Sequence, residues 1–583
     1  MKTIMKTNIV NKILCTLYIV PLYMGIALGF NSCNLDTFPS DELNSDLLLQ
    51  DAKGAEYIMD GVYAIMKDEV EFLGYASGNC YARHYFQMAE FPADNICLSA
   101  HTTDPLYEAT AYMMNDGLKN VGTLWMVAYK GIYMTNTVIS TLDESKPENH
   151  QLLGEAYFMR GLLHLHMVTL YAKPYSLGRD NMGVPLRLSA TPDVQQRASV
   201  GEVYDQIVLD LRKAADLMGK SRGNAGYPSH DAALGVLSRV YLYMEEYDKC
   251  IATVDEALNG AAPASKLEPS ASFASYFANA KTSKETLFCI AHEMSDDRGQ
   301  SSIGSMYLKD GIGWGEIYPS DPLMYLYERF PSDIRYTGFL MPQFSGKTGK
   351  RVYVTIPASE GDPEAPHIKY VTNLIDDGAG NYSFKGADGK TYAIEKRMVN
   401  GEGEKAAAGP YFTYHANYMG EDCLCRINDD VTLRTGYTIP MIFVNKFSYQ
   451  EGNPMLSSPV LCRWGEVILN RAEAYARSGQ DAKALDDVNV IRTRAGIPAE
   501  GMFAPGNLLG YDNVIDVVMD ERRMELAFEG HRMFDVYRNK QNMDRRYAGA
   551  QPFKVVPYTE PHIQYPIPNN EWTVSGIPQN PGY

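Results

Sequence analysis

Several stretches of the chain carry apolar residues at spacings of three and four, which is the period of an amphipathic helix. Residues 200–218 (VGEVYDQIVLDLRKAADLM) are one of these stretches. Their apolar side chains fall on one face: Val203, Ile207, Leu211, Ala214 and Leu217. Ser199 stands just before the stretch and is followed by Glu202. This spacing is typical of a capping box, in which the side chain of each residue accepts a hydrogen bond from the backbone N–H of the other. It therefore predicts the start of a helix.

A pair of helices is predicted immediately downstream. Residues 229–259 (SHDAALGVLSRVYLYMEEYDKCIATVDEALN) contain two helical patterns separated by a turn around Glu246-Tyr247. Pro228-Ser229 marks the start of the first helix, and Gly260 follows the end of the second. The two helices are expected to approach closely where side chains are small: Ala232, Ala233 and Gly235.

The same pattern returns near the C-terminus in residues 458–498 (SPVLCRWGEVILNRAEAYARSGQDAKALDDVNVIRTRAGIP). Pro459 is typical of a helix start, and Gly479 and Gly496 are typical of helix ends. Each unit has about the 34 residues of a tetratricopeptide helix pair. Because neither can bury its apolar face alone, we expect the units to stack on each other or on the rest of the chain.

The character of the sequence changes between residues 260 and 457, where Gly, Pro, Asp and Tyr are frequent. Short alternating runs, RVYVTI at 351–356 and KTYAIEKRM at 390–398, predict β-hairpins. The predicted fold is therefore mainly α: a tetratricopeptide-like scaffold of helix pairs with a long, irregular insertion rich in loops and hairpins. Because irregular segments on a rigid scaffold commonly carry binding groups, we place the binding surface in this insertion and in the loop-rich residues 74–120.

The N-terminus has the layout of an export signal. Three lysines (Lys2, Lys6 and Lys12) precede residues 13–30, which carry no charge. Pro21, Gly25 and Gly29 interrupt this run and favour cleavage over a spanning helix, although an ordinary signal or an uncleaved anchor stays an alternative. Cleavage after Ser32 would leave Cys33 as the first residue, with a thiol that can take a lipid. One acyl chain holds a protein only marginally, whereas two or three hold it stably.

The net charge of -18 disfavours nucleic acid as a partner, because such a surface repels phosphates. The cysteines show no repeating spacing, so they are no disulfide framework. A single pair such as Cys80 with Cys97 can form outside the cytoplasm, whereas Cys250 and Cys462 lie in helical patterns and are interpreted as small buried residues.

Signals of catalysis are absent from the sequence. It contains no nucleophile elbow, P-loop or HExxH motif, and its acidic residues are too numerous to single out a glycosidase pair. His164 and His166 are interpreted as core residues. Cys423 and Cys425 follow His415 but lack a fourth metal ligand nearby, so a disulfide or two packed thiols are favoured there. We expect no enzyme activity, no metal and no cofactor.

A sugar-binding site needs an exposed aromatic ring with polar groups around it, because sugar rings present flat CH faces between hydroxyls. The chain has four tryptophans. Trp125 and Trp464 fall in helical patterns and Trp572 in the C-terminal segment, so packing is the expected role of all three. Trp314 lies between glycines in DGIGWGEIYPSD, and we select it, with Tyr318 of the same stretch, as a ligand-binding candidate.

Six further segments occur in an order that is typical of one family. They are LWMVAYKGIYMTN at 124–136, GEAYFMRGLLHLHMVTLY at 154–171, GVPL at 183–186, ERRMELAFEGHRMFDVYR at 521–538, YPIPNNEW at 565–572 and the terminal QNPGY. With the lipoprotein-type Cys33 and the two helix pairs, the chain resembles the SusD/RagB outer-membrane lipoproteins of Bacteroidetes.

The resemblance implies a lipid-anchored protein on the outer face of the outer membrane, which acts as a lid on a SusC-like TonB-dependent transporter. Family members mostly bind glycans, some bind peptides, and they are regarded as non-enzymatic. The resemblance also suggests that Arg532 and Asp535 hold helices together. It places ligand contacts in one loop region, where the candidates are Asn79, Tyr81, Arg83, Asp94, Asn95, His101 and Tyr107.

The predicted organisation has five parts: a signal peptide (1–32), a lipidated tether (33–45), an N-terminal helical part (46–259), a binding part rich in loops and hairpins (260–457) and a C-terminal helix pair with the family's terminal element (458–583). The favoured function is capture of a nutrient glycan and its delivery to the transporter. A RagB-like peptide binder, a scaffold for protein partners and a degradative enzyme are the alternatives.

Overall fold

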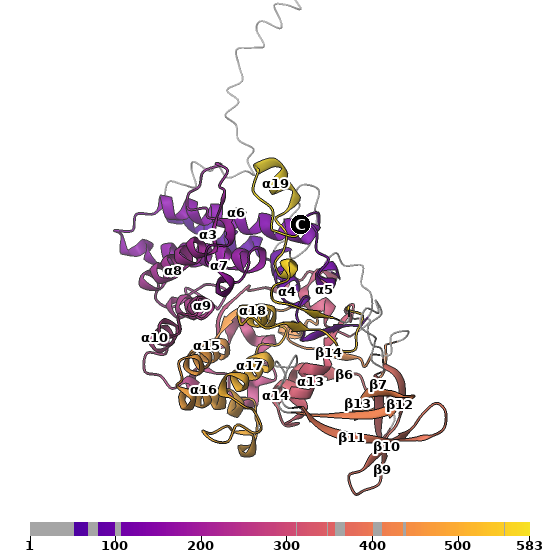
Figure 1. Ribbon diagram of the computed structural model, residues 1–583. Helices are drawn as coiled ribbons and strands as arrows, with labels where there is room; N and C mark the ends of the chain where they lie inside the picture. Colours follow the sequence, from indigo (N-terminus) through magenta and orange to yellow (C-terminus); the bar gives the residue numbers. More distant parts are fainter. Residues whose placement is uncertain are drawn as a thin grey trace, which may run out of the picture. The chain divides into compact units, whose positions relative to one another are not determined.

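The structure is a computed structural model that describes residues 52–67, 80–99, 107–309, 312–346, 348–355, 368–399, 411–434, 439–552 and 554–583. The chain divides into two units, Met1–Gly54 and Ala55–Tyr583. Nearly all of the first unit, including Cys33, lies outside the described residues, so the account below concerns the second unit (Figure 1).

A run of antiparallel helices forms the first half of the scaffold. They are α6 (Lys119–Thr141), α7 (His150–Tyr171), α8 (Val200–Leu217), α9 (His230–Tyr243) and α10 (Tyr247–Leu258). Each of these helices packs against the next one along the chain. The capping box at the start of α8 is present, because Ser199 accepts from the backbone of Glu202 and the Glu202 side chain accepts in return. The predicted pair α9–α10 is confirmed, with Asn259 and Gly260 at positive φ after its second helix.

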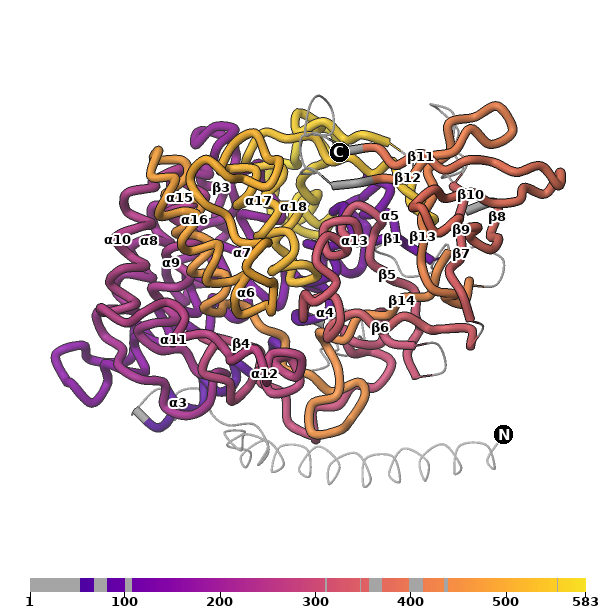
Figure 2. Tube along the Cα trace, turned by 90° about the horizontal axis from the view of Figure 1, so that it is seen from below, coloured from indigo at the N-terminus to yellow at the C-terminus, as the bar shows by residue number. Residues whose placement is uncertain are grey.

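The C-terminal helices complete the same scaffold. They are α15 (Trp464–Arg477), α16 (Asp481–Arg494), α17 (Val514–Glu525) and α18 (Arg532–Arg538). Because α15 packs against α9, α10 and α17, the two predicted helix pairs share one hydrophobic core (Figure 2). Gly479 and Gly496, both at positive φ, end α15 and α16 as predicted.

Two details of the helix-pair prediction are wrong. Pro459 precedes a strand, β15 (Val460–Arg463), and the helix begins only at Trp464. The small Gly235 does not serve the contact with α10. A Cβ at this position would lie 2.9 Å from both Cys462 Sγ and Leu287 Cδ1, so Gly235 allows α9 to approach β15 and β4 (Thr286–Cys289).

The other helices are shorter or lie at the edges of the scaffold. They are α3 (Ala52–Ile65), α4 (Cys80–Glu90), α5 (Tyr107–Ala111), α11 (Pro263–Lys266), α12 (Ser270–Phe273), α13 (Asp321–Glu328), α14 (Ile334–Phe339) and α19 (Asn569–Ser575). Three short antiparallel pairs join distant segments, namely β1 (Ile96–Leu98) with β5 (Ile317–Pro319), β4 with β15, and β6 (Leu340–Pro342) with β14 (Ile442–Val444). Two more pairs are local, namely β2 (Met182–Pro185) with β3 (Arg197–Ser199) and β16 (Met543–Asp544) with β17 (Val555–Val556).

The hairpins predicted in the insertion form one antiparallel sheet of seven strands. Its order is β8-β7-β13-β12-β11-β10-β9. The strands are β7 (Lys350–Thr355), β8 (Ile368–Asn373), β9 (Ile375–Asp376), β10 (Tyr382–Lys385), β11 (Thr391–Val399), β12 (Tyr411–Tyr418) and β13 (Glu421–Asp429). The sheet has a small hydrophobic core of its own, which includes Val354, Phe384 and Tyr418.

Buried ion pairs fasten the C-terminal helices to the insertion. Glu525 of α17 accepts from Arg463 at 2.6 Å and also pairs with Arg494 of α16. Glu285 accepts from the same two arginines, at 2.9 and 2.8 Å. Because all four side chains are buried, their charges balance inside the protein instead of in water.

The cysteines whose side chains the structure describes are free and buried. Cys97 is a free, buried thiol, and the side chain of Cys80, its possible partner, lies outside the described part of the structure. Cys423 and Cys425 are also free and buried, which confirms two packed thiols in place of a disulfide. Burial raises the pKa of Cys425 to about 12, so this thiol stays protonated at neutral pH.

Candidate functional site

The loop that carries Trp314 holds its indole at the surface. Trp314 is 51% exposed. Its Nε1 donates to the carbonyl oxygen of Gln300 at 3.2 Å, and the amide of Gln300 donates to the carbonyl oxygen of Ile312 at 2.9 Å. The backbone N–H of Trp314 donates to the carbonyl oxygen of Ser305 at 2.6 Å. These bonds fix one edge of the ring and leave a flat apolar surface in contact with water.

The two glycines that flank Trp314 are each required for a different physical reason. A Cβ on Gly313 would lie 2.4 Å from the carbonyl oxygen of Ser305, so only glycine permits this close approach. Gly315 has a φ of 58°, which favours a residue without a Cβ. Its carbonyl oxygen accepts from Arg434 and from Ser99, and these bonds tie the loop to two other segments.

The pairing of β1 with β5 brings together the two loop regions selected from the sequence. Cys97 lies opposite Tyr318 in this ladder, and Ser320 donates to the backbone of Asn95 and Asp94 at 2.9 and 2.6 Å. The segment around residue 95 therefore lies directly beside the strand that follows Trp314.

Four of the predicted ligand contacts are buried beneath this surface: Tyr81, Asp94, Asn95 and Tyr318. Asp94 accepts from Arg532 at 2.7 Å, and Asn95 accepts from Arg523 at 2.8 Å. Burial by itself would raise the pKa of Asp94, but these two arginines lower it to about 2. The four side chains support the loops from inside and, in this conformation, do not reach a ligand at the surface.

The remaining predicted contacts divide into two groups. Arg83, on α4, is half-buried and approaches Met306 Sδ at 3.9 Å, so it lies near the segment that holds Trp314. Tyr107 is half-buried and donates to the carbonyl oxygen of Ala550 at 3.3 Å. Asn79 and His101 lie outside the described residues.

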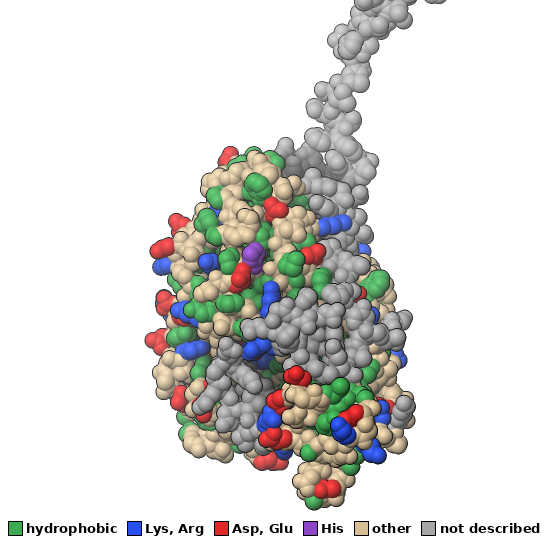
Figure 3. All heavy atoms as spheres, turned by 45° about the vertical axis from the view of Figure 1, so that its right-hand side comes forward, with side chains coloured by type: hydrophobic (Ala, Val, Ile, Leu, Met, Phe, Trp, Pro, Cys, Tyr) green, Lys and Arg blue, Asp and Glu red, His purple; other side chains and the backbone are tan. Residues whose placement is uncertain are grey.

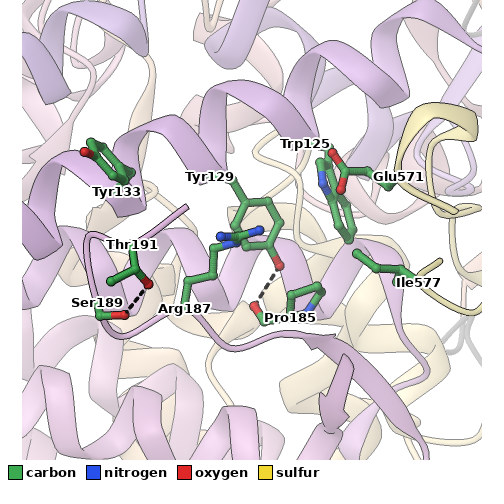
Figure 4. Close-up of a pocket in the computed structure, with 9 residues that line it drawn as sticks. All are labelled: Trp125, Tyr129, Tyr133, Pro185, Arg187, Ser189, Thr191, Glu571 and Ile577. Atoms are coloured by element: carbon green, nitrogen blue, oxygen red, sulfur yellow. Dashed lines mark hydrogen bonds between the residues drawn. The ribbon is translucent and has the colours of Figure 1, made fainter. Parts of the chain in front are cut away.

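A small pocket lies between α6, the loop after β2 and the C-terminal segment (Figure 4). Its volume is about 100 Å³. Trp125, Tyr129 and Tyr133 project into it from successive turns of α6, and the guanidinium of Arg187 lies over the Tyr129 ring at 5.9 Å. Glu571 lies beside Trp125, and burial raises the pKa of this carboxyl while Arg187 opposes the rise. Sequence analysis assigned Trp125 to packing and missed this face, although the spacing of three aromatic residues at every fourth position could have indicated it.

A second, larger hollow has a volume of 580 Å³. It lies between the α13–α14 segment and the seven-stranded sheet, and its wall contains four aromatic side chains, Tyr325, Tyr336, Phe344 and Tyr414. We call it the α13–sheet groove. Sequence reasoning missed it because its two walls are far apart in the chain and no motif links them.

His164 and His166 on α7 are core residues, as predicted. The Nδ1 atom of His166 lies 2.6 Å from the Tyr81 hydroxyl, and His164 Nδ1 lies 3.0 Å from the Arg160 carbonyl oxygen. Burial lowers the pKa of His164 to about 4, so it is neutral at physiological pH. Within the described part of the chain, no group of three or more His, Cys, Asp or Glu side chains is placed to hold a metal ion.

The C-terminal half of the chain matches a family model. The model describes the SusD family and matches residues 284–583. The chain belongs to the SusD family. A second model, described as starch-binding and associating with the outer membrane, matches residues 41–242 of this SusD-family protein.

Relatives of the SusD-family protein cover most of its length. SusD-like protein P2 of Formosa agariphila is 23% identical over 492 residues, covering 82% of this chain and 83% of the relative. A SusD superfamily structure from Bacteroides thetaiotaomicron superposes with a TM-score of 0.66 at 20% identity and covers 92% of this chain and 100% of its own. A laminarin-binding SusD-like protein superposes with a TM-score of 0.59 at 18% identity, again covering 92% and 100%. These likenesses confirm the mainly α, SusD-like fold.

Across the residues with described positions, none of the helices of this SusD-family protein is long and apolar enough to cross a membrane. On the face of the molecule that Figure 3 draws, the described basic and acidic side chains are interspersed with apolar ones.

Proposed function

We propose that this SusD-family protein captures a glycan at the cell surface, without cleaving it, and delivers it to a SusC-like TonB-dependent transporter. The observation that carries the proposal is the exposed Trp314, whose indole is fixed at its Nε1 edge by the Gln300 carbonyl. An immobile indole loses little side-chain entropy when a sugar ring stacks on it, so its apolar face is available at low cost.

The relatives support a glycan as the ligand. One family model that matches the chain is described as starch-binding, and one similar structure is named as a laminarin-binding protein. Both starch and laminarin are neutral glucans, whose hydroxyls need hydrogen-bonding side chains and whose CH faces need aromatic rings.

Delivery depends on attachment to the membrane. We propose Cys33 as the site of lipidation, followed by a tether to residue 45, a helical part (46–259), a binding part (260–457) and a C-terminal part (458–583). A tether keeps a lid close to its transporter while the lid is open, so moderate docking affinity is sufficient and the lid can cycle. The helical scaffold is the surface that we expect to face the transporter.

Binding is tested with the soluble chain that begins at Leu35, titrated by calorimetry with maltohexaose, laminarihexaose and a set of oligopeptides. We expect a glucan to bind unchanged in length, and Trp314→Ala to weaken its binding at least tenfold. Trp572→Ala is the matched control, because Trp572 is also exposed, at 40%, but lies on α19. Binding of peptides alone, or equal affinity in Trp314→Ala and the intact chain, would overturn the proposal.

A further inference from the structure

The α13–sheet groove has the size and the wall chemistry of a ligand site. Its volume of 580 Å³ falls inside the range of about 300–1,000 Å³ that is typical of small-molecule sites. Phe344 is 58% exposed at its wall, although a phenylalanine at that exposure loses the burial that usually stabilises it. The groove therefore presents apolar ring surface to solvent.

Polar groups in the groove are free to bind a ligand. The hydroxyl groups of Tyr336 and Tyr414 have no hydrogen-bond partner among the described residues, although both rings are partly buried. Burial raises the pKa of both phenols, which keeps them protonated as donors. The ammonium of Lys350 lies 3.9 Å from Asp429, and both side chains are exposed.

Other charged groups of the same walls are already held in place. Glu328 accepts from Arg426 at 2.8 Å, and Arg329 donates to the Tyr511 hydroxyl at 2.9 Å. These bonds hold α13 and Arg329 in place in the wall of the groove. The groove thus combines a fixed frame with a few unsatisfied hydrogen-bonding groups, which is the usual design of a preformed site.

The sheet topology favours a sugar over a peptide. Strands β6 and β14 also contribute to the groove, but they form a separate two-stranded sheet of three residues per strand, in which Pro342 has no N–H to pair. The wall formed by the seven-stranded sheet is lined by β7, β11, β12 and β13, and each of these strands has a hydrogen-bonded neighbour on both sides. No strand edge of this wall can add an extended peptide, and an amphipathic helix would need an apolar groove instead of one with charged residues. Recognition must run through side chains, namely aromatic faces with hydroxyl, ammonium and carboxylate groups beside them, and these match the CH faces and hydroxyls of sugars.

We propose that the α13–sheet groove is a second glycan-binding site, which holds a short segment of the same polysaccharide chain that Trp314 binds. The class of ligand rests on the proposed function, whereas the location rests on the groove alone. Two sites on one protein raise the affinity for a polymer beyond that of either site, because the second contact becomes intramolecular.

The test uses the chain from Leu35 and three variants. Phe344→Ala removes the exposed ring, the double variant Tyr336→Phe with Tyr414→Phe removes only two hydroxyls, and Tyr57→Ala is the control for loss of an exposed aromatic ring elsewhere. Calorimetry with maltohexaose and laminarihexaose counts the sites, and hydrogen exchange with and without sugar reports protection of β12 and β13.

We expect two sites in the intact chain and in Tyr57→Ala. Trp314→Ala should keep one site and the protection of β12 and β13, whereas Phe344→Ala should lose that site and that protection and keep the Trp314 site. The tyrosine double variant should bind at least fivefold more weakly at the groove. A single site that depends on Trp314 alone would overturn this inference and leave the proposed function standing. Failure of the intact chain to bind any glycan would overturn both.

Discussion

Two buried glutamates show how strongly neighbouring charges change the pKa of the same type of side chain. Glu90, on α4, accepts a hydrogen bond from the Gly530 N–H at 3.1 Å, but burial dominates and raises its pKa to about 7. Glu525 is equally buried, which by itself would raise its pKa, but Arg494, Arg463 and Arg335 hold the pKa well below its usual range. At neutral pH, Glu90 is therefore poised to titrate and Glu525 is a permanent anion.

We expect Glu90→Gln to remove a pH dependence of stability. A pKa that folding raises from 4.5 to about 7 means that the neutral form is favoured in the folded state. The raised pKa of Glu90 contributes its full stabilisation below pH 4.5, and this stabilisation is lost as the pH rises through 7. The variant should match the intact protein near pH 4.5 and exceed its free energy of unfolding at pH 8 by up to about 3 kcal/mol. Urea unfolding at the two pH values measures this difference, and parallel pH profiles would contradict it.

Single residues also mark where sequence reasoning succeeds and where it fails. Trp314 was selected because glycines flank it, and local chain geometry does decide its exposure. Asp94 is a candidate because it lies in the loop region where the family resemblance places ligand contacts, yet its partners Arg523 and Arg532 lie more than 400 positions away in the chain. Arg532 and Asp535 were expected to hold helices together. Asp535 does join α18 to α17 through Arg522, whereas Arg532 joins α18 to Asp94 in the segment before β1. Polarity alone does not reveal such distant partners.

At the scale of elements, helix ends were predictable because their signals are local. Ser199 with Glu202 and the glycines at 479 and 496 act within one helical turn. The strand after Pro459 was not predictable, because β15 exists only through its pairing with β4, about 170 residues earlier in the chain. The hairpins of the insertion were predictable as strands, but their order in the sheet, which places β7 beside β13, depends on non-local pairing.

We expect Gly235→Ala to destabilise the contact between α9 and β15. Alanine inside a helix is normally more favourable than glycine by about 1 kcal/mol. Here the new Cβ would meet Cys462 Sγ and Leu287 Cδ1 at 2.9 Å, and overpacking typically costs about 1–3 kcal/mol. The free energy of unfolding should fall by about 1 kcal/mol in net terms. Gly219→Ala is the control, because nothing lies within 4 Å of its Cβ position, and an equal response of the two variants in urea unfolding would contradict the expectation.

Removing Glu525 should weaken the junction of α17, α16 and β15. In Glu525→Gln, the side-chain volume stays the same but Arg463 and Arg494 lose a carboxylate inside the core. Breaking a buried pair in this way costs about 3–5 kcal/mol. Because the pKa of Glu525 lies far below 4.5, the cost should be the same at pH 5 and pH 8. Denaturant unfolding at both pH values tests this, with Glu202→Gln at the exposed cap of α8 as the mild control.

At the scale of the whole molecule, one core spans both helical parts, while the sheet keeps a smaller core of its own. The scaffold can therefore stay rigid while the insertion carries the ligand-binding surfaces that we propose. Net charge and ligand selection also have separate physical origins. The net charge of -18 favours solubility but gives no preference for the neutral glycan that we propose as ligand, so we expect selection to rest on rings and hydroxyls.

The tether is expected to affect delivery and not binding. Cys33→Ala removes the proposed lipid attachment but changes no residue of the Trp314 loop or the α13–sheet groove, so the Kd for a glucan hexasaccharide should stay within twofold of that of the intact chain. Co-purification with a co-expressed SusC-like transporter, and growth on the glycan, should fall at least tenfold, because the lid loses its high local concentration. Fatty-acid labelling checks that the lipid is absent. If the variant keeps its label or supports full growth, attachment at Cys33 is not what holds the lid at its transporter.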